Sequence, residues 1–471
     1  MKRIIILIIL CIITICSYAQ INVSKADALI ESQILSNPDY SDCWIFRYDA
    51  NANIQLIYNK TITLQNDVFA YVVSRKPEQA WIDGYEYYFV SKNNGSISKQ
   101  TYTYCPETFD NWIRIYGKDL VSGNKTYNFE SETAKTRRKL MIPSNRGNQT
   151  HKYAVIISGG FNKQNNHIRY WNDCSTIYKV LKNYYGYKDS DIYVLISDGQ
   201  SYSEDRNINS DPTNPRYDSS PWDLDGDGIC DIDYSATKSN ISNVFNQLAN
   251  KVTSEDNLFV FTTDHGEYGP YLCLWNKEIM NDTEFTNEID KVNANHISVL
   301  MLQCYSGGFI NKLAKKNRVI MTAASGYEQS NGSFYFNLEC FLMPWIAAVT
   351  GFDINNNIVN ADANNDGKIS MYEAFVYARD HDSMAISGNE HPQYCSVNEH
   401  LGEYLTLNGC DCEPIYVENR TITSNLTITG CIVNVSNVTI QNNSIVTIDA
   451  GESATLNGPF EVKLGSTLEI K

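Results

Sequence analysis

Five apolar runs alternate with helical patterns through the middle of the chain. The runs lie at residues 153–158, 192–196, 258–262, 296–303 and 319–323. Between them, residues 169–184 and 239–252 repeat apolar positions at the spacing of a helix. Continuous apolar strands separated by helices are typical of a mostly parallel sheet that helices cover on both faces. We therefore expect an α/β domain over residues 152–411.

The segments on either side follow other patterns. Residues 20–130 begin with a helix pattern at 24–35 and continue with strand-like runs such as 68–73 and 87–90, which predicts a small α+β domain. Residues 131–151 are polar and locally basic, so we expect an exposed linker there. Residues 412–471 alternate polar and apolar positions, with Asn, Gly and Ser at short intervals. This tail predicts a β-rich unit, either a fragment of a sandwich or a few rungs of a solenoid.

The first residues have the pattern of an export signal. Lys2 and Arg3 precede an apolar run at 4–15, and Ser17-Tyr18-Ala19 supplies small residues for cleavage, so we expect a signal peptide at 1–19. The run is short for a transmembrane anchor, which needs about 20 apolar residues. Cys16 offers a lipoprotein alternative, but Ile15 stands where a small residue should precede a lipidated cysteine. We expect a secreted, surface or periplasmic protein with no integral membrane segment.

The net charge and the number of cysteines limit the classes of function that the chain can have. The formal net charge is −16, and such an acidic chain repels nucleic acid and anionic lipid. Of 13 cysteines, Cys11 and Cys16 leave with the signal peptide, so an odd number remains. If the others pair in an oxidising compartment, at least one thiol stays unpaired, which fits a catalytic cysteine without proving one.

Two strand ends carry reactive side chains. The run 258–262 leads into Asp264, His265 and Gly266, and the run 296–303 leads into Cys304. If these strands are neighbours, their ends lie close together, since adjacent strands are about 4.8 Å apart. An imidazole beside a thiol favours the thiolate, and the N–H groups of Gly266 and Cys304 can stabilise an oxyanion. Gly307-Gly308 would open a helix whose N-terminal dipole also favours the thiolate.

Either residue alone has a simpler interpretation. A single histidine after a strand is usually structural, and a single cysteine is usually buried and inert. The pair, at two strand ends in this order, favours cysteine catalysis.

The two motifs resemble those of a known family. Thr263-Asp264-His265-Gly266, followed by residues 303–308 (Gln-Cys-Tyr-Ser-Gly-Gly), is similar to the legumain-like branch of the caspase-fold cysteine peptidases. The resemblance covers roughly residues 152–350 and implies a caspase-like fold, an endopeptidase activity and a protein or peptide substrate.

The resemblance also implies a substrate pocket. Arg169, at the start of the first helix, would bind the residue before the scissile bond and favour Asn or Asp, because a guanidinium donates to a side-chain carbonyl or carboxylate. Asp264 and Ser325 are the other expected substrate-binding residues. The family often has an asparagine two residues before this arginine to orient the histidine, whereas His167 stands here. Either Asn166 substitutes, or the site works as a Cys-His dyad.

A calcium loop stands near the end of the α/β domain. The segment 362–373 places oxygen ligands at each position of an EF-hand loop, with Gly367 for the turn and a helix pattern after it. The expected Ca²⁺ ligands are Asp362, Asn364, Asp366, Lys368 (through its carbonyl), Ser370 and Glu373.

A second acidic loop begins in the same way. Its expected ligands are Asp223, Asp225, Asp227, Ile229 (through its carbonyl) and Asp231, but its twelfth position is Tyr234. Calcium there would need a variant geometry, and the simpler alternative for either loop is a solvated acidic turn.

Two functions from different classes follow. One is a calcium-stabilised endopeptidase made as a precursor, in which residues 20–130 are either a pro-domain that is removed by cleavage in the linker or a permanent partner packed on the sheet for stability. The linker offers Arg137, Arg138 and Lys139 to a trypsin-like enzyme, and Asn145 and Asn148 to an Asn-specific one. The other is a calcium-binding surface adhesin with an inactive peptidase-like domain. The pair His265 and Cys304 favours the peptidase, since a binding module has no need of it.

Overall fold

The computed structural model describes residues 20–82, 84–100, 102–119, 125–141, 151–209, 215–410 and 414–471. It divides into two compact units, Met1–Leu120 with Ser210–Pro215, and Val121–Asn209 with Arg216–Lys471. The expected signal peptide and the linker residues 142–150, with Asn145 and Asn148, lie outside the described residues. Within the described ranges, none of the helices combines the length and apolar character that a membrane crossing requires.

The N-terminal unit is an antiparallel sheet with one covering helix. Its five strands run in the order β6-β5-β4-β1-β7. Helix α1 (Val23–Leu35) buries Ala26, Ile30 and Ile34 against one face. The hairpin of β2 and β3 packs on the other face, so both faces of the sheet are covered. The strands are β1 (Trp44–Tyr48), β2 (Ile54–Leu56), β3 (Lys60–Ile62), β4 (Val68–Ser74), β5 (Tyr85–Ser91), β6 (Ile97–Gln100) and β7 (Trp112–Tyr116).

The second unit contains the sheet that the five apolar runs predict. Its strands lie in the order β20-β17-β16-β12-β8-β9, and all neighbours are parallel except β20 at one edge. The parallel strands are β8 (Lys152–Ser158), β9 (Ile192–Ile196), β12 (Asn257–Thr263), β16 (His296–Met301) and β17 (Arg318–Thr322), and the edge strand is β20 (Gln393–Ser396). The prediction of a mostly parallel, caspase-like α/β sheet is confirmed.

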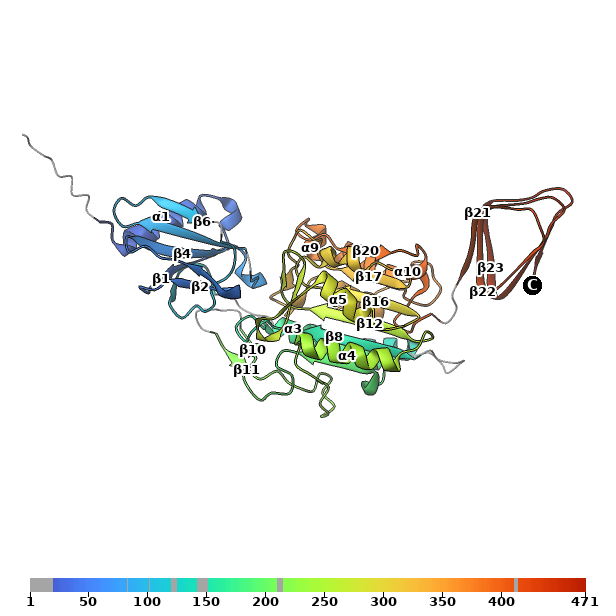
Figure 1. The fold of residues 1–471 in the computed structure, drawn as a ribbon, viewed down its shortest axis with the longest axis horizontal. Coiled ribbons are helices and arrows are strands. Elements are labelled where there is room, and N and C mark those ends of the chain that lie inside the picture. Colours follow the sequence, from blue (N-terminus) through green and yellow to red (C-terminus); the bar gives the residue numbers. More distant parts are fainter. Residues whose placement is uncertain are drawn as a thin grey trace, which may run out of the picture. The chain divides into compact units, whose positions relative to one another are not determined.

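Helices cover both faces of this sheet. Figure 1 shows α4 (Lys238–Lys251) and α5 (Asp282–Ile289) on one face of the sheet. Their apolar side chains pack on those of β8, β12 and β16. On the other face lie α3 (Ile168–Tyr185), α7 (Leu342–Thr350) and α8 (Met371–His381). Strands buried on both sides explain the continuous apolar runs, because neither face meets water.

Short elements complete the unit. They are β10 (Arg206–Asn207), β11 (Tyr217–Asp218), β13 (Gly266–Glu267), β14 (Tyr271–Cys273), β15 (Ile279–Asn281), α6 (Ile310–Leu313), β18 (Gly332–Ser333), β19 (Leu338–Glu339), α9 (Ser383–Ile386) and α10 (Leu401–Tyr404).

Residues 125–141 belong to this second unit rather than to a linker. They end in helix α2 (Glu132–Met141), and Tyr127, Phe129 and Ala134 are buried in the same core as α3 and α7. The hydroxyl of Tyr184 donates to the carbonyl of Ala134 at 3.1 Å. The prediction of an exposed linker over 131–151 is therefore wrong for its described part. Two aromatic side chains just before the basic stretch anchor it on the core.

The C-terminal tail is a coil of parallel strands. β21 (Ile415–Ile422), β22 (Leu426–Ile440), β23 (Ile445–Val462) and β24 (Thr467–Ile470) stack in sequence order, and Figure 1 shows them winding in successive turns. Parallel pairing of consecutive strands favours the solenoid over the sandwich fragment. Asn419 and Asn437 occupy left-handed conformations, and the Asn437 amide donates to the Asn419 oxygen at 2.7 Å, so the two stack at one corner.

Candidate active site

The fold brings His265 and Cys304 to the same edge of the sheet. β12 pairs in parallel with β16, with Thr262 opposite Met301. His265 lies three residues beyond Thr262, and Cys304 lies three residues beyond Met301. The prediction that their strands are neighbours is confirmed.

Gly266 lies directly against the backbone of Cys304. A Cβ atom added to residue 266 would lie 2.1 Å from the Cys304 carbonyl oxygen, far inside contact distance. Only glycine allows this approach, so the histidine loop and the cysteine loop form one packed unit.

The imidazole of His265 has a defined orientation. Its Nε2 atom lies 2.9 Å from the carbonyl oxygen of Asn165. A carbonyl can only accept, so Nε2 carries the hydrogen and Nδ1 is left unprotonated in the neutral ring. The hydroxyl of Tyr170 lies 3.3 Å from Nδ1. The backbone carbonyl of Asn165 thus orients the His265 ring, a role that the resemblance assigns to an asparagine side chain.

The imidazole is also held neutral. His265 is buried, and burial, followed by the positive charge of Arg169, lowers its pKa to about 3, against the opposing effect of the Asn165 hydrogen bond. The ring is therefore neutral near pH 7, and its unprotonated nitrogen carries the lone pair that a proton acceptor requires.

Cys304 lies in a tight turn beneath a neighbouring loop. The Ser330 hydroxyl lies 3.7 Å from the sulfur, and the Ser330 carbonyl lies 4.0 Å from it. Tyr305 follows with a left-handed φ of 61°, and a 3-10 turn, Ser306–Phe309, leads into the four residues of α6. The expected helix is therefore one short turn, and its dipole contributes less to the thiolate than the sequence suggests.

Arg169 is buried beside this pair and has a partner that no motif indicates. Its Nε atom donates to Glu339 Oε1 at 2.7 Å, and its Nη2 atom donates to the Tyr170 hydroxyl at 2.7 Å. The hairpin of β18 and β19 closes over it, since a Cβ at Gly332 would lie 2.7 Å from Arg169 Cδ. A chain of contacts therefore runs from Glu339 through Arg169 and Tyr170 to His265.

Three predicted residues have other contacts. The Asp264 carboxylate accepts from the Gly160 and His265 N–H groups and so connects the ends of β8 and β12. The Asn166 amide donates to Ser197 at 2.7 Å and does not orient His265. The backbone N–H of Ser325 donates to Glu328 in a turn after β17.

Four groups around the pair were missed from the sequence: the Asn165 carbonyl, the Tyr170 hydroxyl, Ser330 and Glu339. Tyr170 adjoins Arg169, which is the only local signal. Glu339 reaches the pocket through the β18–β19 pairing, and no spacing in the sequence marks it.

A neutral groove lies beside Gly307 and Gly308, in the turn that follows Cys304. It has a volume of about 390 Å³. Its lining carries no charged side chain among the described residues, and it consists of Tyr268, Gly269, Pro270, Gly307, Gly308, Ile310, Asn311, Gly326, Tyr327 and Gln393.

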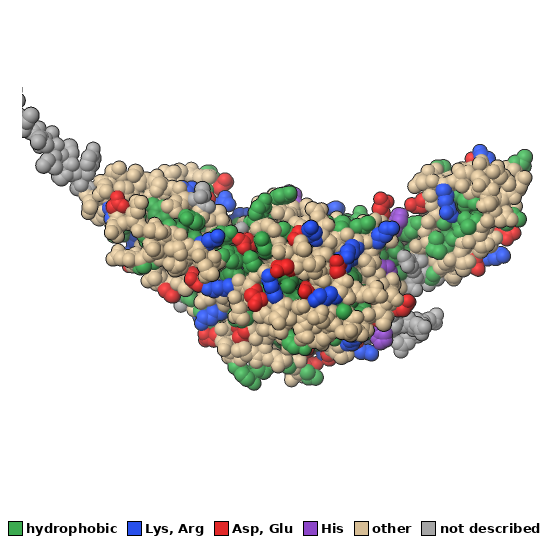
Figure 2. Space-filling view, viewed as in Figure 1, with side chains coloured by type: hydrophobic (Ala, Val, Ile, Leu, Met, Phe, Trp, Pro, Cys, Tyr) green, Lys and Arg blue, Asp and Glu red, His purple; other side chains and the backbone are tan. Residues whose placement is uncertain are grey.

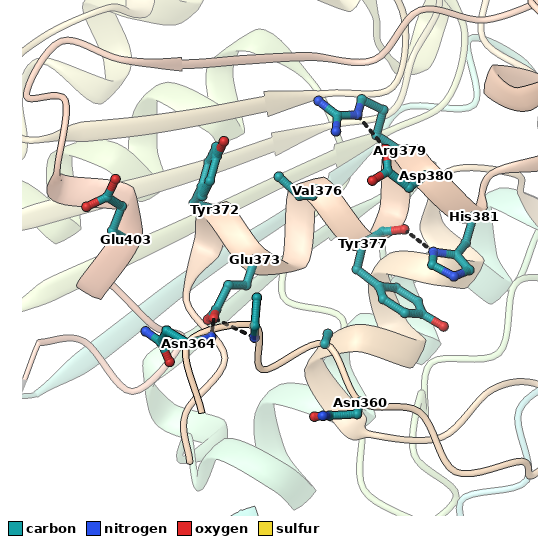
Figure 3. Close-up of a pocket in the computed structure, with 12 residues that line it drawn as sticks. Asn360, Asn364, Tyr372, Glu373, Val376, Tyr377, Arg379, Asp380, His381 and Glu403 are labelled. Carbon is teal, nitrogen blue, oxygen red and sulfur yellow. Dashed lines mark hydrogen bonds and ion pairs between the residues drawn. The ribbon is translucent and has the colours of Figure 1, made fainter. Parts of the chain in front are cut away.

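In the first acidic loop, residues 362–373, the acidic side chains accept hydrogen bonds from backbone N–H groups of the same loop. Asp362 accepts from the N–H groups of Asp366 and Gly367, and Gly367 has the left-handed φ of 80° that the turn requires. Glu373 turns back onto the loop, as Figure 3 shows, and accepts from the N–H groups of residues 363 and 364. The set of carboxylate, amide and hydroxyl oxygens is the kind that Ca²⁺ prefers.

The second acidic loop draws three carboxylates together. Asp223, Asp225 and Asp227 place oxygen atoms within 4.8 Å of one another, the one such acidic cluster that the described residues contain. The Lys182 ammonium lies 2.7 Å from Asp225 and 2.9 Å from Asp227. Asp231 is engaged elsewhere, since its two oxygens accept from the Tyr178 hydroxyl and the Leu224 N–H.

Sequence comparison places the chain in a family. A comparison with curated proteins finds none that matches it. Residues 152–393 match the Peptidase C13 family. The match covers about half of the chain and includes the five parallel strands of the central sheet, the His265 and Cys304 loops, and the Arg169–Glu339 pair. The chain therefore belongs to the peptidase C13 family, the legumain family of cysteine peptidases.

Proposed function

We propose that this cysteine peptidase is an endopeptidase that cleaves after asparagine, with Cys304 as nucleophile and His265 as base. The observation that carries the proposal is the packing of the two loops against each other, with the Gly266 backbone in contact with the Cys304 carbonyl. No other buried histidine and cysteine follow adjacent parallel strands in the described part of the chain.

The reaction follows from the groups in place. His265 takes the thiol proton as the sulfur of Cys304 bonds to the substrate carbonyl carbon, and the N–H groups of Gly266 and Cys304 stabilise the oxyanion. His265 then gives the proton to the departing amine as the C–N bond breaks, which leaves an acyl-enzyme. Water, deprotonated by the same imidazole, hydrolyses the thioester and restores the thiol.

The buried pair Arg169 and Glu339 supports a preference for asparagine. A primary amide has both an acceptor and a donor, so its oxygen can accept from the guanidinium while its NH₂ group donates to the carboxylate. An aspartate offers acceptors only and repels Glu339, whereas an apolar side chain leaves both buried groups without a hydrogen bond to substrate.

Calcium is proposed as a stabilising ligand of the loop 362–373. The composition of that loop supports it, and its place before α8 means that an ion there would fix the start of a core helix. For the loop 223–231 the carboxylate cluster supports the same proposal, but an ion must displace the Lys182 ammonium first.

The wider biological setting is proposed from the sequence. The N-terminal pattern supports export, and the separate unit before residue 121 supports synthesis as a precursor. Figure 2 shows acidic side chains interspersed with basic ones over the visible face, a surface suited to protein substrates rather than to nucleic acid.

Peptide turnover tests the proposal. Matched peptides that differ only in the residue before the scissile bond, Asn, Asp, Leu or Lys, are incubated with wild-type protein and with Cys304→Ala. Turnover of the Asn peptide by the wild type alone is expected. An inactive wild type that binds calcium would instead favour the adhesin, and dominant cleavage after Lys would overturn the specificity.

A further inference from the structure

The hairpin of β18 and β19, with its flanking residues Ser330 and Cys340, forms one wall of the active site. Ser330 contacts the sulfur of Cys304, Gly332 packs on Arg169, and Glu339 pairs with Arg169. A small displacement of this hairpin would therefore disturb the nucleophile and the substrate pocket together.

The buried carboxyl group of Glu390 is hydrogen-bonded to the base of the hairpin at Asn331. Glu390 Oε2 accepts from the backbone N–H of Asn331 at 2.7 Å and from its side-chain amide at 2.8 Å. The Asn331 carbonyl accepts from the N–H of Cys340 at 2.8 Å, which closes the hairpin. Glu390 belongs to the segment before β20, and its hydrogen bonds reach Asn331 rather than Cys304 or Arg169, so it contacts the hairpin and not the reacting groups.

The surroundings of Glu390 disfavour a charge. Glu390 is 1% exposed and Asp382 is fully buried. Glu390 Oε1 and Asp382 Oδ2 have no hydrogen-bond partner among the described residues, while Asp382 Oδ1 accepts from the N–H of Met384. Burial, followed by the charge of Asp382, raises the pKa of Glu390 well above that of an ordinary glutamate.

Other titratable groups face the same site. Glu339 adds negative charge to both acids, and Cys340 lies among the three carboxyl groups. The positive charge of Arg169 acts on Cys340, and Arg169 is already paired with Glu339. Two ionised carboxylates here would lie in a medium of low dielectric with no cation of their own.

We propose that Glu390 is a positioning residue of the active site, which holds the Ser330–Cys340 hairpin in its working position as a neutral carboxylic acid and releases it when both Glu390 and Asp382 ionise. The proposal rests on the proposed function for its effect on turnover. The movement of the hairpin itself is independent of any activity.

Three variants test the proposal. Glu390→Gln keeps an oxygen acceptor for Asn331 and cannot ionise, Asp382→Asn keeps the cap for Met384 and removes the neighbouring charge, and Glu390→Ala removes the acceptor. Asp256→Asn is the control, because Asp256 is a buried acid at the opposite end of β12 that accepts from Thr253. The value of kcat/KM is measured against pH for each variant, with KM and kcat separated.

The expected pattern separates positioning from simple stability. Glu390→Gln and Asp382→Asn should retain the activity of the wild type at acidic pH and move the alkaline loss of kcat/KM to higher pH. Glu390→Ala should lose roughly tenfold to a hundredfold in kcat/KM at every pH, because the hairpin is no longer held in place. The control should follow the wild-type profile. An alkaline limb that neither Glu390→Gln nor Asp382→Asn moves would overturn the proposal.

Hydrogen exchange gives a readout without turnover. In the wild type, after correction for the intrinsic pH dependence, amides of residues 331–340 should exchange faster at alkaline than at acidic pH, and Glu390→Gln should suppress the difference. Equal protection at both pH values in the wild type would overturn the proposal even if the enzyme is active. Conversely, a pH-dependent hairpin in a protein that cleaves no peptide would contradict the proposed function and leave this assignment standing.

Discussion

Glu339 Oε1 lies 2.7 Å from Arg169 Nε, and the two side chains are 3% and 8% exposed. A buried pair of this kind is stable only as a unit, because removal of one partner leaves a charge without compensation, at about 3–5 kcal/mol. Its place beside Cys304 makes it the feature that most directly connects the fold to the choice of substrate.

Glu339→Gln should change that choice. The amide keeps the shape of the pocket but no longer repels a substrate carboxylate, so the ratio of kcat/KM for Asp over Asn peptides should rise by about tenfold or more. Peptides that differ only at this residue measure the ratio, and Arg169→Lys serves as a comparison that keeps the charge but loses the planar fork. An unchanged ratio in Glu339→Gln would contradict a role for the pair in specificity.

Gly266→Ala should reduce activity more than stability. The new methyl group would lie 2.1 Å from the Cys304 carbonyl oxygen, so the cysteine loop must move. A displacement of about 1 Å can lower the rate by roughly a hundredfold. Turnover and melting temperature are measured together, with Gly451→Ala as the control, because its Cβ would meet the nearest atom at an ordinary 3.7 Å. Full activity in Gly266→Ala would show that the two loops are not in the contact described.

Calcium should raise the melting temperature, and a chelator should lower it. An ion that binds only the native state stabilises it by about 2.7 kcal/mol at a hundredfold excess over Kd. Glu373→Gln should weaken the response of the loop 362–373. Lys182→Met should strengthen binding at the loop 223–231, since the ammonium that competes for Asp225 and Asp227 is gone. A melting temperature that ignores both calcium and chelator in all three proteins would count against both loops.

Asp382 should make the protein less stable as pH rises. Burial raises its pKa from 3.8 to about 6, so the folded state keeps a proton that the unfolded state has lost. The protonated Asp382 carboxyl contributes its full stabilisation to the free energy of unfolding below pH 3.8. This contribution, about 3 kcal/mol, is lost as the pH rises to about 6.

The buried imidazole of His265 changes the stability of the protein with pH in the opposite direction. The pKa of His265 falls from 6.5 to about 3, so its contribution is lost as pH falls. Between pH 4 and 6 the two contributions oppose each other in the wild type, so Asp382→Asn isolates the carboxyl effect and stability should rise more steeply with pH in the variant, as measured by urea midpoints. The same slope in the variant and the wild type would rule out this assignment.

Proteolytic activation should not cut the chain within helix α2. Arg137 packs on Gly351, and Arg138 donates to the Phe129 carbonyl, so the cleavage points predicted at 137–139 lie in a packed helix rather than an exposed linker. If the N-terminal unit is removed, we expect a new terminus outside residues 125–141, and Asn124, Asn145 and Asn148 are the asparagines available. N-terminal sequencing of incubated protein identifies the site. Wild type should shorten as turnover rises, and Cys304→Ala should stay full length if the cut is autocatalytic. A stable product that begins within 135–140 would contradict this.

The parallel sheet and the pair His265 and Cys304 could be predicted from the sequence, for a physical reason. Short continuous apolar runs that alternate with helix patterns are typical of parallel strands buried on both faces, and reactive residues just after such runs meet at one edge when the strands are neighbours. The groups that contact His265, Cys304 and Arg169 could not be predicted from the sequence. Asn165 acts through a carbonyl that any residue would supply, and Glu339 and Glu390 reach the site by packing of distant segments. The linker prediction failed because Tyr127 and Phe129 lie in an otherwise polar stretch, where only the folded core shows that they are buried.

If Cys304 is the nucleophile of an Asn-directed peptidase, an electrophile that resembles an asparagine substrate should label it covalently. A peptidyl electrophile with asparagine next to its reactive group is added to wild type, Cys304→Ala and His265→Ala, and the adduct is located by mass. The exposed Cys230 is the internal control for non-specific alkylation. We predict one adduct on Cys304 in the wild type, none in Cys304→Ala, and greatly slowed labelling in His265→Ala. Labelling of Cys230 with Cys304 unmodified, or peptide turnover that survives in Cys304→Ala, would contradict the account.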